Sequence, residues 1–262
     1  MKKPLTVIKI GSSVLINAQA IPEVIDEIIA LQRQNKKVLV VISALGDTTD
    51  NLLQSGKAIY KGIFDLQKYP KETATLLANG ELTALAFFGL AFAQINIPVT
   101  TLCNKYLYTT GDPLNAHPEH LNMVLLEHAF AKTNIVLVPG FLGCNVDRTC
   151  TLLGRGGSDL SAIFCAWALK AQECLLIKDV VGVFNCDPNT FGEDADCYQS
   201  LRYQDAFLVC SHLIQKQALH FAKTHQLKFI VKSMGPHPGT LVGAETTTFY
   251  SEFHEYNLDT AV

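Results

Sequence analysis

The segment Gly154–Asp159, which reads GRGGSD, combines three glycines with an arginine, a hydroxyl and a carboxylate, just before an apolar stretch with helical spacing. Glycine allows the backbone to approach a ligand closely and to adopt positive φ angles. The N-terminus of the helix that follows would attract an anion, and Arg155 adds positive charge to the same loop. The composition therefore favours an anion-binding loop, although a tight turn with Ser158 or Asp159 as the helix cap would read the same way.

Lys9 lies at the end of the first apolar run, and Gly11 and Ser12 follow almost directly. A lysine in this place can neutralise phosphate oxygens, while the backbone N–H groups of Gly11 and Ser12 can donate hydrogen bonds to them. The segment is not a Walker A loop, because GxxxxGK[ST] occurs nowhere in the chain. It predicts a phosphate contact, unless Lys9 is simply an exposed lysine at the end of a strand.

Two more segments place charged residues beside glycines. Another apolar run ends in Lys178 and Asp179 and continues through a glycine turn. Phe184 and Asp187 follow, a pattern that could hold an adenine ring but that a plain strand-to-helix connection would also show. Glu81 follows a glycine in a predicted first helical turn, where a carboxylate complements the helix dipole by about 0.3–1 kcal/mol.

The elements that must position these residues alternate between strands and helices. Short apolar runs predict strands at Leu5–Ile10, Lys37–Ile42, Val99–Cys103, Ile135–Val138, Glu173–Ile177 and Lys228–Val231. Apolar residues at helical spacing predict helices over Ile21–Leu31, Leu76–Gln94, Asn122–Ala131, Ser158–Ala171 and Ser211–His225. This alternation predicts an α/β fold, a three-layer sandwich with a mostly parallel central sheet that helices cover on both faces.

In open α/β sheets, ligands bind beyond the carboxyl ends of the strands. The loops at that edge that carry glycine, hydroxyl or acidic residues are Gly11–Ser13, Ser43–Asp50, Gly140–Asp159 and Asp179–Asn189. The sequence contains no internal repeat and no linker rich in Pro, Ser or Gly, so residues 1–262 are predicted to form a single domain. A ligand site formed by these four loops is expected.

The composition excludes several classes of protein. With 48% apolar and 17% charged residues the chain is not disordered, and a net charge of −3 argues against binding to nucleic acid or an anionic membrane. Eight cysteines without a CxxC pair or a histidine cluster predict reduced thiols and no metal site. Lys9 and Gly11 interrupt what would otherwise resemble a signal peptide, and no run reaches about 18 apolar residues. A cytoplasmic protein is expected.

These motifs, in this order, resemble the amino acid kinase family, and within it the aspartokinases most closely. The resemblance covers nearly the whole chain, and the GRGGSD element is its most specific part. The matching stretches are Val40–Gly46 with Thr49 and Asp50 (VVVSAMG…TN in the family), Gly80-Glu81 (GE), Gly140–Gly143 with Leu153–Asp159 (GFIG…LGRGGSD), Asp179–Pro188 (DVDGIYTADP) and Lys228–Leu241, which resembles the closing strand pair.

The resemblance implies an amino acid kinase (carbamate kinase-like) fold, with an acceptor-binding lobe over about residues 1–170 and a nucleotide-binding lobe over about 171–262. It implies that ATP, with Mg²⁺, phosphorylates the carboxylate of an amino acid, most simply L-aspartate to 4-phospho-L-aspartate, in a homodimer. The catalytic residues it implies are Lys9 and Asp159. The acceptor-binding residues it implies are Ser43, Thr49, Glu81, Arg155 and Ser158. The nucleotide-binding residues are Gly11, Ser12, Lys178, Asp179, Phe184, Asp187 and Lys216.

The resemblance also assigns roles to single residues. Lys9 would bind the transferring phosphoryl group, and Asp159 would orient the lysines and the substrate. Arg155 would clamp a carboxylate of the acceptor, since a planar guanidinium matches it. Glu81 would pair with the acceptor's amino group. No side chain is implied as a dedicated metal ligand.

The sequence departs from the family pattern mainly on the nucleotide side. Ser12 stands where aspartokinases have a second glycine, and Lys178 stands where they have a threonine before the aspartate. His212 replaces the lysine of the family's KVLHPR segment. Lys216, one turn later on the predicted helix, or Lys178 could restore the missing charge.

Two alternatives remain open at this stage. The chain could phosphorylate another amino acid or a small biosynthetic acceptor, or it could be a degenerate kinase-like subunit that binds a ligand or an active paralogue. Aspartokinases usually continue into regulatory modules, for which the residues after Leu241 leave no room. Feedback inhibition by lysine or threonine in cis is therefore not expected.

Overall fold

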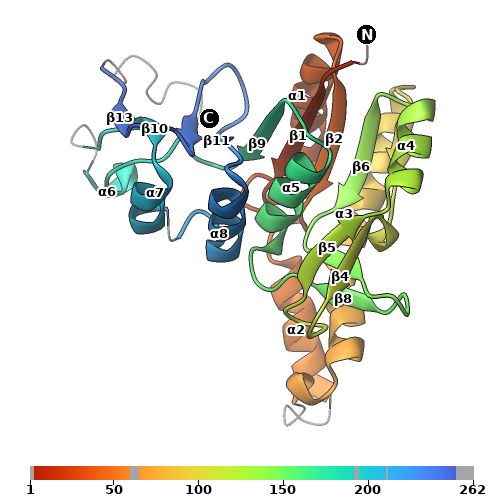
Figure 1. Ribbon diagram of the computed structural model, residues 1–262. Coiled ribbons are helices and arrows are strands. Elements are labelled where there is room, and N and C mark those ends of the chain that lie inside the picture. Colours follow the sequence, from red (N-terminus) through yellow and green to blue (C-terminus); the bar gives the residue numbers. More distant parts are fainter. Residues whose placement is uncertain (1–2, 60–64, 192–194, 211, 252–262) are drawn as a thin grey trace.

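The computed structural model describes residues 3–59, 65–191, 195–210 and 212–251 (Figure 1). Within these residues, the larger sheet has the order β13-β10-β12-β11-β9-β1-β2-β6-β3. Its strands are β1 Leu5–Ile10, β2 Lys37–Ile42, β3 Thr100–Thr101, β6 Ile135–Pro139, β9 Glu173–Ile177, β10 Tyr198–Leu201, β11 Phe229–Lys232, β12 Thr240–Val242 and β13 Thr248–Phe249. The helices are α1 Ile21–Arg33, α2 Thr48–Ala58, α3 Pro70–Gln94, α4 Met123–Lys132, α5 Gly157–Ala168, α6 Pro188–Phe191, α7 Tyr203–Val209 and α8 Lys216–His225.

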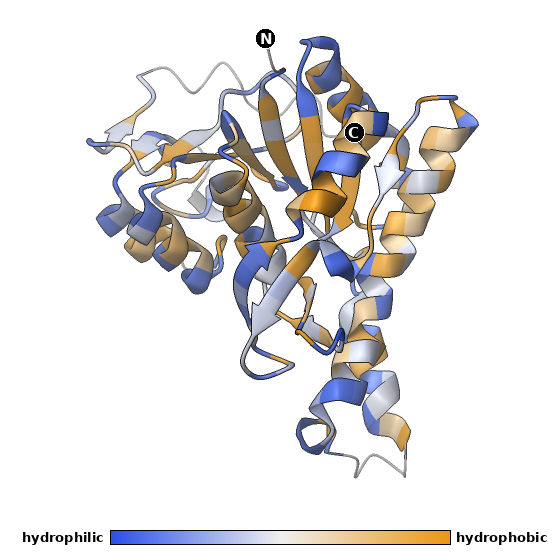
Figure 2. Ribbon diagram, turned by 45° about the vertical axis from the view of Figure 1, so that its right-hand side comes forward, coloured by the Kyte–Doolittle hydropathy of each residue, from blue (hydrophilic) through white to orange (hydrophobic). Residues whose placement is uncertain are grey.

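The central strands run parallel and are buried on both faces. β1 pairs with β2 on one side and with β9 on the other, both in parallel. Val7 and Leu39 face one side and pack under α5, whereas Ile8 and Val40 face the other side and pack under α1 and α3. The central strands are therefore mostly apolar, as Figure 2 shows, and the predicted three-layer sandwich is confirmed.

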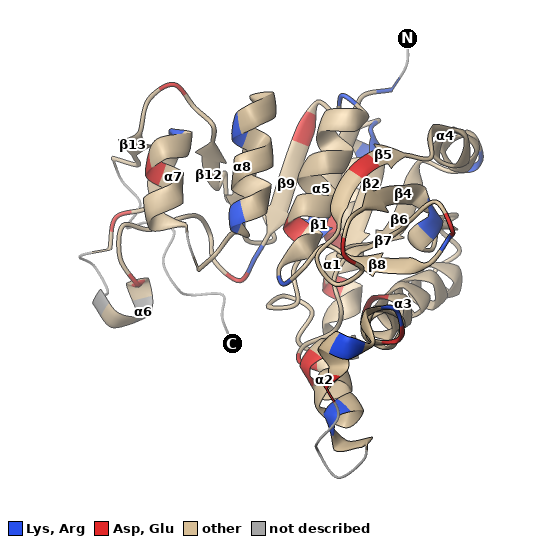
Figure 3. Ribbon diagram, turned by 60° about the horizontal axis from the view of Figure 1, so that its bottom comes forward, with Lys and Arg blue, Asp and Glu red and all other residues tan. Residues whose placement is uncertain are grey.

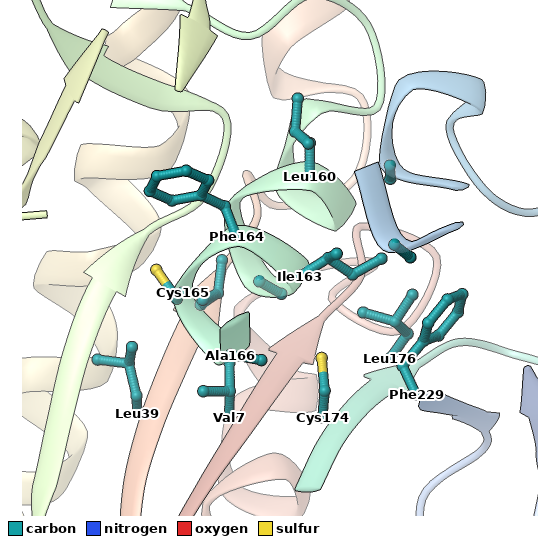
Figure 4. Packing of buried hydrophobic residues seen from close by; sticks show 14 of the residues in the cluster. Val7, Leu39, Leu160, Ile163, Phe164, Cys165, Ala166, Cys174, Leu176 and Phe229 are labelled. Atoms are coloured by element: carbon teal, nitrogen blue, oxygen red, sulfur yellow. The ribbon is translucent and has the colours of Figure 1, made fainter. Parts of the chain in front are cut away.

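α5 covers the middle of the sheet. Ile163, Phe164 and Ala166 are buried on this helix, in the same cluster as Val7 of β1 and Leu176 of β9 (Figure 4). α5 begins inside the glycine-rich segment Gly154–Asp159, so this packing fixes the position of that segment relative to the ends of β1 and β9. The predicted bounds of β1, β2 and β9 are confirmed, because buried apolar runs bounded by polar residues define strands sharply.

Two predicted helices begin elsewhere. α3 begins at Pro70 rather than Leu76, with the proline in the first turn where its missing N–H costs nothing. α8 begins at Lys216 rather than Ser211. Residues 212–215 form a turn instead, and Gln215 is the N-cap of α8.

A second, smaller sheet was not predicted. Its order is β5-β4-β7-β8, and it contains β4 Leu107–Thr110, β5 His117–Leu121, β7 Leu142–Cys144 and β8 Cys150–Leu152. β8 runs antiparallel to β7 and leads directly into the glycine-rich segment. This sheet therefore holds the N-terminal side of that segment, while α5 holds its C-terminal side.

α3 is, by length and composition, apolar enough to cross a membrane, and it is the one such helix within the described residues. It buries Phe88 and Phe92 against the sheet, in the same cluster as α1 and β2. It also carries Glu81 in the protein interior. Burial of these side chains by the sheet is typical of a core helix, and the apolar composition of α3 follows from that position.

α8 lies beside α5, and an aromatic cluster joins the C-terminal ends of the two helices. The ring of Trp167 on α5 lies 5.5 Å from that of Phe221 and 4.3 Å from that of His225, measured between centroids. Trp167 is nevertheless 40% exposed. The cluster couples the positions of two helices whose N-terminal ends both lie near the predicted ligand site.

Candidate active site

A cavity of about 830 Å³ lies at the carboxyl ends of β1, β2 and β9, where the glycine-rich segment, α2, α3 and the turn before α8 meet. Acidic and basic segments come together at this junction (Figure 3). The predicted site residues that line the cavity are Lys9, Ser12, Ser43, Thr49, Glu81, Arg155, Ser158, Asp159 and Lys178. Residues from five separate segments of the sequence therefore reach one cavity, as the rule for open α/β sheets predicts.

Lys9, Lys178 and Asp159 form a buried charged cluster in the wall of the cavity. The Lys9 Nζ atom lies 2.9 Å from Asp159 Oδ1, and the Lys178 Nζ atom lies 3.0 Å from Oδ1 and 3.1 Å from Oδ2. The three side chains are at most 10% exposed. Two ammonium groups thus surround one carboxylate, which leaves an excess of positive charge beside the cavity.

The register of the sheet explains why these side chains meet. Lys9 on β1 pairs with Leu176 on β9, so the two residues share a face of the sheet. Lys178 follows Leu176 by two positions and therefore points to the same face. α5 packs on that face, and Asp159 in its first turn is placed between the two ammonium groups.

Burial and charge change the pKa values of this cluster. Burial lowers the pKa of Lys9 to about 8, and the nearby Lys178 adds to the decrease, although Asp159 opposes it. Burial alone would raise the pKa of Asp159, but the attraction of Lys9 and Lys178 outweighs it and holds the pKa below its usual value. Asp159 is therefore an ionised carboxylate that stabilises the two cations.

The glycine-rich segment has the backbone conformation that its glycines predict. Gly154 and Gly156 have φ angles of +74° and +77°, which other residues rarely adopt. Gly156 is the N-cap of α5 and provides no side-chain cap, so the possibility that Ser158 or Asp159 caps the helix is wrong. Asp159 instead turns to the lysines, and the backbone N–H groups of Gly157 and Asp159 donate to the carbonyls of Gly154 and Gly156.

Gly11 does not line the cavity but makes room for Lys9. Its N–H donates to the carbonyl of Ile177 at 3.1 Å, which ties the end of β1 to the end of β9. A Cβ atom at Gly11 would lie 3.2 Å from the Lys9 Nζ atom and 3.1 Å from that carbonyl oxygen. A side chain here would therefore crowd the ammonium group.

Glu81 is not in a first helical turn, so the predicted dipole interaction is wrong. Because α3 begins at Pro70, Glu81 lies in the middle of the helix, is 4% exposed and lines the cavity. Its Oε2 atom has no hydrogen-bond partner. Burial raises the pKa of Glu81 to about 7, against the effect of hydrogen bonds from the backbone of Glu81 and Ala44. An unpaired carboxylate of this kind can receive a cationic group of a ligand.

We expect Glu81→Gln to stabilise the protein at pH 8 but not at pH 5. Folding raises the pKa of Glu81 from 4.5 to about 7. Burial of Glu81 therefore costs no stability below pH 4.5, where the carboxyl is protonated in both states, and the free energy of unfolding falls as the pH rises from 4.5 to 7. Above pH 7 the ionised group opposes folding by about 3 kcal/mol, which the neutral amide avoids. Urea unfolding at both pH values measures the difference. Glu127→Gln on the exposed face of α4 serves as control, and an equal gain at both pH values would contradict the assignment.

The other predicted nucleotide-binding residues lie outside this cavity. Asp179 and Asp187 are exposed, and Asp187 accepts a hydrogen bond from Thr190 Oγ1 at 3.0 Å. Phe184 forms an isolated antiparallel bridge with Cys197. These residues follow β9, so they adjoin the cavity in the chain without lining it, and their role in nucleotide binding stays a prediction.

Lys216 is exposed and does not reach the cavity. The expectation that Lys216 follows His212 by one helical turn is wrong, because the segment from His212 to Gln215 is a turn and α8 begins only at Lys216. His212 itself lines the cavity. Of the two lysines that could restore the missing charge, Lys178 is the one beside Lys9.

Sequence reasoning missed several polar residues of the cavity, and Gln215 and Asn115 are two of them. Gln215 donates from its backbone N–H to Asp159 Oδ2 at 3.4 Å and from Nε2 to the carbonyl of Leu153 at 3.1 Å, which links the turn before α8 to the glycine-rich segment. Asn115 lines the cavity from the turn between β4 and β5. Gln215 lies in the segment that resembles KVLHPR, so that motif could have identified it, whereas no motif contains Asn115.

Among the described residues, no disulfide joins any of the eight cysteines. Across the described parts of the chain, the structure contains no group of three or more His, Cys, Asp or Glu side chains that could hold a metal ion.

The fold agrees with comparisons to known proteins. Residues 4–225 match the profile of the amino acid kinase family. The chain belongs to the amino acid kinase family, as its motifs suggested.

Its relatives in that family include aspartokinases. The chain is 30% identical over 245 residues to aspartokinase of Mycobacterium tuberculosis (strain ATCC 25618 / H37Rv), and the match covers 91% of this chain and 57% of the relative. It is 30% identical over 250 residues to aspartokinase 2 of Bacillus subtilis (strain 168), and this match covers 93% of this chain and 60% of the relative. The chain therefore spans less than two thirds of the length of these relatives.

Solved structures show the same fold. Aspartate kinase from Synechocystis superposes with a TM-score of 0.75 at 26% identity, over 91% of this chain and 39% of that one. Escherichia coli aspartokinase III, in complex with aspartate and ADP, gives a TM-score of 0.77 at 21% identity, over 91% and 64%. UMP kinase from Bacillus anthracis gives 0.63 at 19% identity, over 94% and 98%. The predicted fold class is confirmed.

Proposed function

We propose that this chain transfers the γ-phosphoryl group of ATP to the carboxylate of an amino acid, and that the acceptor is L-aspartate, which becomes 4-phospho-L-aspartate. The observation that carries the proposal is the buried cluster of Lys9, Asp159 and Lys178 in the wall of the cavity. Its excess positive charge suits the oxygens of a phosphoryl group in transfer. The aspartokinase relatives, and the aspartate and ADP bound to a protein of the same fold, support the choice of substrates.

The reaction needs no general base. The acceptor carboxylate is ionised at neutral pH, so one of its oxygens attacks the γ-phosphorus while the bond to the bridging oxygen of ADP breaks. The barrier lies in bringing two anions together and in stabilising charge on the equatorial oxygens. Lys9 and Lys178 supply the balancing positive charge from fixed positions. Asp159 holds the two lysines in place.

The acceptor would lie on the side formed by α2, α3 and the glycine-rich segment, within about residues 1–170. Glu81 offers a buried carboxylate for the amino group, and Arg155 offers a guanidinium for a carboxylate. Ser43, Thr49 and Ser158 line the cavity between them. The nucleotide would approach from the opposite side, where Ser12 and Lys178 lie and where the chain after β9 continues.

The residues present fit the phosphates of a nucleotide with Mg²⁺ carried on them. Mg²⁺ is commonly held by substrate phosphates with one or two carboxylates rather than by a protein cage. The carboxylate of Asp159 contacts two ammonium groups, and Asp179 is exposed next to Lys178. When bound, Mg²⁺ would neutralise part of the phosphate charge.

The test is a coupled assay of ADP release from the purified protein with a panel of amino acids. Release with L-aspartate, and trapping of the product by hydroxylamine, would identify an acyl phosphate. Release with another acceptor only would correct the substrate. Binding of L-aspartate without ADP release from any acceptor would indicate a ligand-binding subunit instead. The homodimer and the cytoplasmic location stay predictions, and light scattering tests the first.

We expect Arg155→Lys to raise the KM for the acceptor about tenfold and to leave the KM for ATP unchanged. Lysine keeps the charge but cannot form two parallel hydrogen bonds to a carboxylate, which is worth about 1.4 kcal/mol or more. Arg202→Lys is a matched control, because Arg202 is also exposed and paired with an aspartate, Asp205, but lies outside the cavity. A rise in the KM for ATP alone would contradict the assignment of Arg155 to the acceptor and would place it at the nucleotide.

A further inference from the structure

Arg155 is held from across the cavity by a carboxylate of the protein itself. Its Nη2 atom lies 2.8 Å from Oδ1 of Asp50, in the first turn of α2. Both side chains line the cavity, and they are 88% and 57% exposed. The contact joins one nitrogen to one oxygen, so it is not the two-bond geometry in which arginine binds carboxylates most strongly.

An exposed ion pair of this kind adds little to stability. Such pairs contribute between about 0 and 1 kcal/mol, because water screens them and two long side chains lose freedom. The first turn of α2 explains why an acidic residue is favoured at this position. The helix dipole does not explain the contact with Arg155, because it favours acidic residues at several positions of the helix end. Asp47, the N-cap of the same helix, lies outside the cavity, whereas Asp50 lines it.

We propose that Asp50 sets the affinity for the acceptor by competing with its carboxylate for Arg155. The inference rests on the proposed function, because it takes Arg155 as the group that holds an acceptor carboxylate. An incoming carboxylate exchanges the single contact with Asp50 for two parallel contacts with the guanidinium. An acceptor with a neutral group in that position cannot make this exchange. Asp50 therefore weakens binding of every acceptor carboxylate by the strength of its own contact with Arg155.

The kinetic test compares Asp50→Asn with Asp47→Asn. Asp50→Asn is expected to lower the KM for L-aspartate three- to fivefold, up to the equivalent of ~1 kcal/mol for an exposed pair. The KM for ATP should not fall with it. Asp47→Asn removes the same charge from the same helix end and should change neither value. An unchanged or higher KM for L-aspartate in Asp50→Asn, or an equal fall in Asp47→Asn, would overturn the inference.

A double-mutant cycle shows whether the effect passes through Arg155. In an Arg155→Gln background, Asp50→Asn should no longer change the KM for L-aspartate, because the residue for which Asp50 competes is gone. A three- to fivefold effect that persists in this background would mean that Asp50 acts on the acceptor in another way, and it would overturn the inference.

A chemical test separates this inference from the proposed function. The rate at which phenylglyoxal modifies Arg155, read by peptide mass without nucleotide, should rise in Asp50→Asn, with Arg202 as internal reference. L-Aspartate should protect Arg155 at a lower concentration in the variant than in the unaltered protein. These results without ADP release from any acceptor would overturn the proposed function but support the inference. An unchanged rate, or no protection by L-aspartate, would overturn the inference even in a protein that turns over.

Discussion

Lys9→Ala is expected to reduce kcat at least 100-fold. The Lys9 ammonium group is buried beside the cavity and fixed by Asp159. In the proposed reaction it would stabilise the charge on the phosphoryl group, and a water molecule could not supply the same positive charge. Loss of one such preorganised cation corresponds to about 3 kcal/mol of transition-state stabilisation. Steady-state ADP release with saturating substrates measures the effect.

Because Lys9 is buried, its truncation could also disturb packing. Lys9→Met fills nearly the same volume without charge and should lose kcat to the same extent while unfolding close to the unaltered protein in urea. A kcat near that of the unaltered protein in either variant would remove Lys9 from the mechanism. A loss in Lys9→Ala that Lys9→Met restores would assign it a packing role only.

Asp159→Asn is expected to destabilise the protein by about 3–5 kcal/mol at pH 7, because it leaves two buried ammonium groups without a counter-charge. The loss should shrink as the pH rises from 7 to 9. Burial already lowers the pKa of Lys9 to about 8, and without the carboxylate the ammonium group gives up its proton still more readily. Unfolding in urea at both pH values tests this dependence.

The second variant in this experiment is Asp159→Asn combined with Lys178→Met. Removing one ammonium group should recover part of the stability, because a single buried cation remains. A double variant that is less stable than Asp159→Asn alone would show that the charges are not the source of the loss. In that case Asp159 would act mainly through the hydrogen bond from the backbone of Gln215.

The central part of the fold could be predicted because its strands are buried on both faces. β1, β2 and β9 consist of apolar runs with polar ends, so their bounds follow from the sequence. β5, in contrast, reads HPEHL and is mostly exposed, so neither its composition nor its periodicity marks it as a strand. The small sheet that contains it depends on pairing between strands that carry little local signal.

The site was predictable where a residue lies near the end of a strand, directly after a strand, or in the first turn of a helix. Lys9, Lys178 and Asp159 all have this property, and the parallel sheet brings such positions to one edge. Contacts between distant loops were not predictable. Arg155 and Asp50 are 105 positions apart, and Gln215 and Asp159 are 56 apart. These contacts depend on how α2 and α8 pack.

The aromatic cluster between α5 and α8 contains an intrinsic fluorescence probe. Trp167 is the single tryptophan of the chain, so the indole emission of the whole protein comes from one known position. It lies at the end of α5 remote from the glycine-rich segment and contacts Phe221 and His225 of α8. Any shift of α8 relative to α5 when a ligand fills the cavity changes the surroundings of this fluorophore. Titrations of nucleotide and acceptor can therefore be followed separately in the unlabelled protein, without turnover.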